Sequence, residues 1–156
     1  MRIGVVSDTH GILRPEIIDG LAGVDLIIHA GDIGSLAVLE RLEEIARVIP
    51  VRGNVDSGSW AGGIPGVRRF ETNGKRFAVV HDAAALSLDP HDPVDVIIFG
   101  HSHRPSIAYK DGTLLFNPGS SGPRRFRLPT SFGLLTIEGE GMHPEIVYLR
   151  PPAERQ

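Results

Sequence analysis

The chain has 156 residues, enough for one hydrophobic core, and its lack of cysteine excludes disulfides, thiolate zinc sites, iron–sulfur clusters and cysteine nucleophiles. Its formal net charge of −3 and pI of about 6.1 give no general attraction to nucleic acid. No apolar run approaches the length of a membrane span or of a signal-peptide core, so we expect one cytoplasmic domain over residues 1–156, with no membrane partner.

The first half of the chain alternates predicted strands and helices. Short β-branched apolar runs that end in polar or glycine residues predict buried strands over residues 2–8, 24–32 and 47–56. A helix is predicted over 14–23, with Pro15 in its first turn. A second helix is predicted over 35–46, where apolar residues recur at helical spacing and Ser35 can act as N-cap. This order favours parallel strands joined by crossover helices.

The second half favours hairpins, after a Gly- and Ser-rich loop over 57–66. Hairpins are predicted over residues 67–82, 105–120 and 131–150. The turns of the first two are placed at Asn73-Gly74 and Asp111-Gly112, which are typical two-residue hairpin loops. A further buried strand is predicted over 94–103. The whole pattern indicates two sheets packed face to face, with helices outside.

Polar side chains follow five of the predicted strands at the point where each one ends. They are Asp8 and His10, Asp32, Asn54 and Asp56, His81, and His101 with His103. Ligands of α/β sheets bind at the carboxyl ends of the strands, so we expect these oxygen and nitrogen donors to converge on a metal site. Glycines at 31, 53 and 100 would allow the close backbone approach that such a site needs.

Each of these residues alone has a structural explanation. Asp8 could be a turn or cap residue, Asn54 a left-handed turn residue, and His81 a hydrogen-bonded core histidine. His101 and His103 are harder to explain in this way. Residues i and i+2 of an extended segment point to the same side, so both imidazoles can face one point. The combination therefore favours metal ligation.

The order and wording of these segments resemble the calcineurin-like metallophosphoesterases, and in particular the small YfcE-type phosphodiesterases. The matching segments are SDTHG (7–11), AGDI (30–33), GNVD (53–56), VHD (80–82), GHSH (100–103) and NPGS (117–120). The resemblance spans nearly the whole chain. It implies an α/β fold, namely a four-layer α/β/β/α sandwich with two mixed sheets.

The resemblance also implies a dinuclear metal centre. One metal would be held by Asp8, His10, Asp32 and His103, and the other by Asp32, Asn54, His81 and His101, with Asp32 as the bridge. Within this set, catalytic roles are implied for Asp32, Asn54 and His101. Two divalent ions per chain are expected, with manganese preferred and nickel, iron, cobalt or zinc compatible with nitrogen and oxygen ligands.

The implied activity is hydrolysis of a small phosphodiester, rather than a phosphomonoester, by a metal-bridging hydroxide that attacks phosphorus. Two alternatives stay open: a protein-binding scaffold like the retromer subunit Vps29, and a nuclease of the same superfamily. The complete set of ligand types disfavours the scaffold, and the absence of a broad basic face disfavours nucleic acid. Assembly into a homo-oligomer stays open.

Three positions depart from the family pattern. Asp82 stands where the family has glycine, and we expect it to cap a helix rather than to support His81. The segment from His81 to Asp95 is short, so the helix expected there should shrink to a single turn. Val55 stands where many larger members have a histidine that acts as general acid, which removes one proton donor.

Other residues keep two interpretations each. His29 could brace Asp32 or be a satisfied core histidine. Trp60 could anchor a lid or contact a second copy. The basic cluster at 123–127 could contact substrate, although a solvated charge run is favoured. The segment 116–121 is expected to close the rim of the site through backbone groups.

Overall fold

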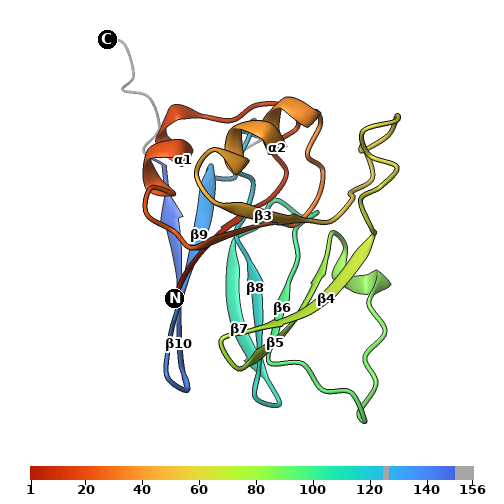
Figure 1. The fold of residues 1–156 in the computed structure, drawn as a ribbon, viewed down its shortest axis with the longest axis vertical. Coiled ribbons are helices and arrows are strands. Elements are labelled where there is room, and N and C mark those ends of the chain that lie inside the picture. The colour runs from red at the N-terminus through yellow and green to blue at the C-terminus, as the bar shows by residue number, and fades with distance from the viewer. Residues whose placement is uncertain (125–126, 150–156) are drawn as a thin grey trace.

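The structure is a computed structural model that describes residues 1–124 and 127–149. Its elements in chain order are β1 (Arg2–Val6), α1 (Pro15–Gly20), β2 (Leu26–His29), α2 (Leu36–Glu43), β3 (Arg47–Pro50), β4 (Val67–Thr72), β5 (Lys75–Val80), the 3₁₀ helix η1 (Ala83–Ala85), β6 (Val96–Ile98), β7 (Ser106–Lys110), β8 (Thr113–Asn117), β9 (Ser131–Glu138) and β10 (Gly141–Tyr148). The strands form two five-stranded sheets, ordered β10-β9-β1-β2-β3 and β4-β5-β6-β8-β7 (Figure 1).

The first sheet is built as the sequence predicts. Strands β1, β2 and β3 are parallel and are joined by α1 and α2, while β9 and β10 return antiparallel at the other edge. Pro15 begins α1, where its missing N–H is not needed. Ser35 occupies the N-cap position of α2, but its side chain makes no capping hydrogen bond, so the expected cap is wrong in its chemistry. Burial of Leu39 and Leu42 fixes this helix instead.

The second sheet combines two hairpins with a parallel centre. Strands β5, β6 and β8 are parallel, and β4 and β7 pair antiparallel with the outer two. The hairpin turns lie at Asn73 and Asp111, which have φ values of 49° and 51°. This left-handed conformation suits Asn and Asp followed by glycine, so both predicted turns are confirmed.

The main core lies between the sheets. Alternate residues of the central strands point into it, with Ile3 and Val5 of β1 meeting Phe77 and Phe116 of the second sheet. The intervening residues of the first sheet, such as Ile27, point outward against α1 and α2. Strands buried on both faces need apolar residues throughout, and this explains their continuous apolar runs. Trp60 is partly buried and packs against this outer core.

The outer face of the second sheet carries little helix. Only η1 lies in the segment between β5 and β6, and the remainder is loop that contains Pro90 and Pro93. Asp82 caps η1 by accepting a hydrogen bond from Ala84 N at 3.0 Å. The single-turn layer and the capping role of Asp82 are therefore confirmed. Within the described residues, no helix is long and apolar enough to cross a membrane.

Candidate metal centre

The loops after β1, β2, β5 and β6 bring the predicted polar residues to one end of the sandwich. Asp8 and His10 follow β1, and Asp32 follows β2, so these three come from the first sheet. His81 follows β5 and His103 follows β6 in the second sheet. Four of these residues are buried, and His10 is partly buried. The site therefore spans the two sheets and draws on residues up to 95 positions apart (103 − 8).

The carboxylates of Asp8 and Asp32 face a ring of imidazole nitrogens. Asp8 Oδ1 lies 3.9 Å from His10 Nε2, 3.8 Å from His81 Nε2 and 3.3 Å from His103 Nε2. Asp32 Oδ2 lies 3.7 Å from His10 Nε2 and 3.2 Å from His81 Nε2. Two overlapping groups result, Asp8–His10–His103 and Asp8–Asp32–His81, and the donor atoms of each lie within 4.8 Å of one another.

The hydrogen bonds of His81 test whether this cluster suits a cation. His81 Nδ1 lies 2.8 Å from the carbonyl oxygen of Ala30, so Nδ1 carries the proton and donates it. In the neutral ring, Nε2 then points a lone pair at carboxylate oxygens. Histidines that ligate metals are commonly oriented in this way by a backbone carbonyl.

Several atoms in the cluster lack ordinary partners. Among the described residues, Asp8 Oδ1, His10 Nε2 and His81 Nε2 are buried without a hydrogen bond of good geometry. Buried polar atoms are rarely left so, because an unmade hydrogen bond is costly. A divalent cation among these oxygen and nitrogen donors would satisfy them together, so the residues fit a metal ion.

The charges of the cluster raise the pKa of a histidine and lower the pKa of a carboxylate, and both shifts favour the charged form. Burial would lower the pKa of His81, but Asp32, the Ala30 carbonyl and Asp8 together raise it above its ordinary value. Burial would raise the pKa of Asp32, but His81 and the Val55 N–H lower it to about 2. The site therefore stabilises positive charge beside ionised carboxylates.

The second oxygen of each carboxylate is held by the protein. Asp8 Oδ2 accepts hydrogen bonds from Ser7 Oγ at 2.7 Å and from the backbone N of His101 at 3.2 Å. Asp32 Oδ1 accepts from the backbone N of Val55 at 3.1 Å. One carboxylate oxygen of each residue is thereby fixed by hydrogen bonds, and the other faces the imidazole nitrogens of the histidines.

The backbone at the site is unusual. Asp8, His10, Asp32, His101 and His103 have φ values of 55°, 47°, 53°, 73° and 61°. Residues other than glycine seldom adopt this left-handed conformation, and it persists where the surrounding structure enforces it. Five of the seven predicted ligands therefore have a strained backbone conformation, which no sequence pattern predicted.

Glycines allow the loops to approach one another, as predicted for positions 31, 53 and 100. A Cβ atom on Gly31 would lie 2.8 Å from the His81 side chain. One on Gly53 would overlap Asp32, and one on Gly100 would overlap Ser7 Oγ. Larger residues at these positions would displace the carboxylates or His81.

His101 and Asn54 lie outside the buried cluster. The His101 side chain is 45% exposed, with its Nε2 3.9 Å from Asp82 Oδ2 and its ring centroid 5.2 Å from that of His81. Asn54 is exposed in the turn that holds Asp32, and within the described part of the chain its side chain makes no hydrogen bond. Both residues are placed at the mouth of the cluster rather than within it.

Asp56 was expected among the converging donors, but it supports the site from outside the two groups of candidate ligands. It is buried and accepts backbone hydrogen bonds from Ile33, Gly34 and Gly53 at 3.2, 2.9 and 2.8 Å, which join the two loops around Asp32. Its hydrogen bonds to backbone N–H groups of other loops could not be predicted from its position in the sequence.

The segment 116–121 contacts the loops of the site through backbone and side-chain groups together, whereas the expectation named backbone groups alone. It is buried: Ser121 N donates to Ser7 O at 2.8 Å, Asn117 Nδ2 to Gly100 O at 3.2 Å, and Ser120 Oγ to Asp8 O at 3.3 Å. His29 does not contact Asp32 but lies 3.0 Å from Thr9 Oγ1. The basic cluster 123–127 lies partly outside the described residues.

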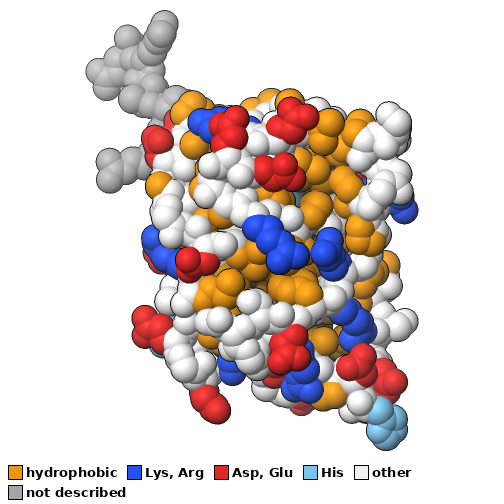
Figure 2. Space-filling view, in the orientation of Figure 1, with side chains coloured by type: hydrophobic (Ala, Val, Ile, Leu, Met, Phe, Trp, Pro, Cys, Tyr) orange, Lys and Arg blue, Asp and Glu red, His pale blue; other side chains and the backbone are white. Residues whose placement is uncertain are grey.

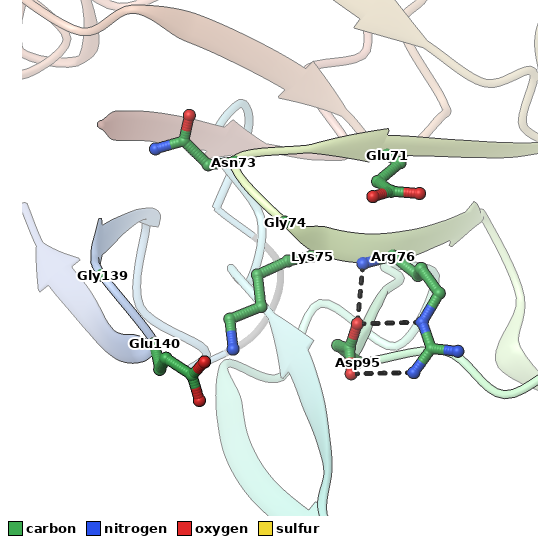
Figure 3. A pocket seen from close by; sticks show the side chains of 8 residues that line it. All are labelled: Glu71, Asn73, Gly74, Lys75, Arg76, Asp95, Gly139 and Glu140. Atoms are coloured by element: carbon green, nitrogen blue, oxygen red, sulfur yellow. Dashed lines mark hydrogen bonds and ion pairs between the residues drawn. The ribbon is translucent and has the colours of Figure 1, made fainter.

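A separate polar crevice of about 330 Å³ lies at the far end of the sandwich, between the β4–β5 and β9–β10 turns (Figure 3). Asp95 forms two contacts with the Arg76 guanidinium there, at 3.2 and 3.3 Å, and accepts from the Arg76 backbone N. None of the predicted ligands lines this crevice.

A family model, the calcineurin-like phosphoesterase superfamily domain, matches residues 1–140. The chain belongs to this superfamily. The phosphoesterase domain is 36% identical over 168 residues to a probable metallophosphoesterase of Methanothermobacter thermautotrophicus, with 99% of this chain and 96% of the relative covered. It is 28% identical to phosphodiesterase YfcE of Escherichia coli, over 86% of this chain and 87% of YfcE.

The phosphoesterase domain also shares its fold with a solved structure of another kind. Wild-type Vps29 from Entamoeba histolytica, in complex with Zn²⁺, matches it with a TM-score of 0.75 at 20% identity, over 95% of this chain and 99% of Vps29. The two-sheet fold and the resemblance to small YfcE-type proteins are confirmed by these comparisons.

Proposed function

We propose that the chain is a divalent-metal-dependent phosphodiesterase with a dinuclear centre. The observation that carries this proposal is the pair of overlapping groups of buried Asp and His side chains at the carboxyl ends of the strands. Membership of the superfamily and a relative named as a phosphodiesterase give it independent support.

In this proposal Asp8, His10 and His103 hold one ion, while His81, Asn54 and His101 hold the other. Asp32 is proposed as the bridge, because its Oδ2 lies within 3.7 Å of both His10 Nε2 and His81 Nε2. The bound ions would supply Lewis-acid chemistry, namely a more acidic water as nucleophile and neutralisation of charge on the phosphoryl oxygens. Manganese is proposed as the ion, and nickel, iron, cobalt and zinc are compatible with the same nitrogen and oxygen ligands.

The chain's own residues would orient the phosphoester. Asn54 and His101 are exposed at the mouth, so those of their polar atoms that do not hold the ion can reach phosphoryl oxygens without rearrangement of the core. Two carboxylates against two divalent ions leave the loaded site positive, which favours an anionic phosphoester despite the chain's net charge of −3. Val55 is 50% exposed beside this mouth and cannot donate a proton, so substrates with stable leaving groups are preferred.

Metal stripping and reconstitution test the proposal. The protein is treated with a chelator, reloaded separately with Mn²⁺, Ni²⁺, Co²⁺, Zn²⁺ and Fe²⁺, and assayed with bis(p-nitrophenyl) phosphate and p-nitrophenyl phosphate. We expect two ions per chain by elemental analysis, loss of activity on stripping, recovery on reloading, and faster cleavage of the diester.

Matched variants distinguish the site from the surface. His103→Ala should lose metal and activity, whereas His91→Ala, which changes an exposed histidine in a loop, should retain both. A reloaded protein that binds no metal and hydrolyses neither ester would favour the scaffold alternative, whose fold is that of Vps29.

A further inference from the structure

Asp82 leaves one carboxylate oxygen unused at the mouth of the candidate metal centre. Its Oδ1 accepts the hydrogen bond from Ala84 N that caps η1, at 3.0 Å. Its Oδ2 makes no hydrogen bond within the described residues and lies 3.9 Å from His101 Nε2. The side chains of Asp82 and His101 are each 45% exposed, so both face solvent at this mouth. Asn or Ser would cap η1 equally well, so the cap does not account for the negative charge.

Among the described residues, no lysine or arginine neutralises the Asp82 carboxylate. Figure 2 shows Lys and Arg side chains gathered across the middle of one face, over β3 and β4. Arg69 of β4 pairs with Asp92 at 3.4 Å and donates to Ser87 O at 3.1 Å, so its charge is used away from Asp82. The charge of Asp82 therefore acts on any ligand that enters the mouth beside His101.

We propose that Asp82 is a specificity-determining residue that disfavours phosphomonoesters and thereby favours phosphodiesters. The inference rests on the proposed function and names the charge class of its substrate. A phosphomonoester carries close to two negative charges above neutral pH, because its second pKa is about 6, whereas a diester carries one. The Asp82 carboxylate repels both esters, but it repels the monoester about twice as strongly.

The distance between Asp82 and the mouth decides how large this discrimination is. A phosphoryl oxygen about 3 Å from His101 Nε2, the length of a hydrogen bond, lies no more than about 7 Å from Asp82 Oδ2. At that distance, one additional unit of negative charge weakens binding about 3-fold at the dielectric constant of water and about 50-fold at a constant of about 20. The half-exposed mouth lies between these limits, and concentrated salt should screen the effect.

Neutral variants that can still cap η1 test this inference. Asp82→Asn keeps an oxygen in the capping position and loses the charge, and Asp82→Ser is a second neutral residue that can cap. Asp89→Asn is the matched control, because Asp89 accepts a hydrogen bond from His91 N at 2.8 Å in the exposed loop between η1 and β6. The control makes the same change of charge and side chain away from the mouth.

Each protein is reloaded with Mn²⁺, and its ion content is measured. Calorimetry at about pH 8 then compares the affinity for inorganic phosphate, which is a dianion there, with the affinity for dimethyl phosphate, a monoanion. In parallel, kcat/KM is measured for p-nitrophenyl phosphate and for bis(p-nitrophenyl) phosphate. Both measurements are made at about 20 mM and about 500 mM NaCl.

We expect Asp82→Asn and Asp82→Ser to keep the ion content of the unmodified protein and to bind inorganic phosphate at least about 3-fold more tightly at low salt. The affinity for dimethyl phosphate should change less. The ratio of kcat/KM for the monoester to that for the diester should rise with the phosphate affinity, and the concentrated salt should remove most of both gains. Asp89→Asn should match the unmodified protein.

Unchanged phosphate affinity and an unchanged ratio in both neutral variants would overturn the inference. An equal change in Asp89→Asn would overturn it as well, and so would loss of an ion from Asp82→Asn, which would make Asp82 a metal ligand. A reloaded protein that cleaves neither ester would overturn the proposed function instead, and phosphate binding would still decide the role of Asp82. A reloaded protein that binds no phosphate would overturn both.

Discussion

His29 should make the protein unstable in mild acid. It is fully buried, accepts a hydrogen bond on Nδ1 from Gly31 N at 3.1 Å, and lies with Nε2 3.0 Å from Thr9 Oγ1. Thr9 Oγ1 donates to Ile33 O at 2.8 Å, so Nε2 must carry the proton of the neutral ring and donate it to Thr9. A second proton on Nδ1 would oppose the Gly31 N–H.

Burial lowers the pKa of His29 from 6.5 to about 3, against the opposing effect of Asp56. The unfolded chain therefore binds a proton at His29 below pH 6.5, whereas the folded chain binds it only below about pH 3. Stability from this group is complete above pH 6.5 and is lost as the pH falls toward 3. Linkage gives a loss of about 2 kcal/mol between pH 7.5 and pH 5, a value that holds for any folded pKa well below 5.

Urea unfolding followed by circular dichroism at pH 7.5, 6 and 5, with a chelator present, measures this loss. His29→Gln should be less stable than the unmodified protein at pH 7.5, but its stability should fall by about 2 kcal/mol less on acidification. His91→Gln, an exposed control, should follow the unmodified protein. Parallel curves for His29→Gln and the unmodified protein would refute the assignment of a buried neutral imidazole.

Three further substitutions test the site. Ser7→Ala removes the hydrogen bond to Asp8 Oδ2 and should weaken metal binding, measured by calorimetry, about 10- to 100-fold. Ser131→Ala is the control: it removes an equally buried serine that donates to Pro118 O, and it should lower stability without weakening metal binding. Gly53→Ala drives a Cβ into Asp32 and should lower both metal affinity and the melting temperature, whereas Gly66→Ala, with open space around it, should change neither. Val55→His should flatten the dependence of log rate on leaving-group pKa in a series of aryl and alkyl phosphodiesters; an already flat dependence in the unmodified enzyme, with chemistry rate-limiting, would reveal another proton donor.

The strands and the buried ligands could be predicted because they are local patterns. Asp8, Asp32 and His81 each lie within three residues of the end of an apolar strand, and parallel strands bring such ends together. Asn73 and Asp111 likewise announced their turns through the glycine that follows each of them. In each case the information lies within a few adjacent residues.

The supports of the site could not be predicted, because they join distant segments. Ser120 reaches the Asp8 carbonyl across 112 positions, and only the fold brings the two together. The capping prediction for Ser35 was wrong for a different reason. Serine is a residue type that suits an N-cap, but α2 is held by burial of its apolar side chains and forms without a side-chain cap hydrogen bond. The left-handed backbone of His101 and His103 overrides the extended geometry from which their convergence was inferred.

The site takes its residues from both sheets, and this has a mechanical consequence. The second sheet is an insertion in the chain between β3 and β9, so the covalent backbone enters and leaves it only through the segments 51–66 and 118–130. An ion shared by Asp32 and His81 would add a third link between the two sheets, at the end of the sandwich opposite the Arg76–Asp95 pair. Metal loading would then hold the inserted second sheet against the first sheet. Amide hydrogen exchange would slow in both sheets at the end that binds the ion.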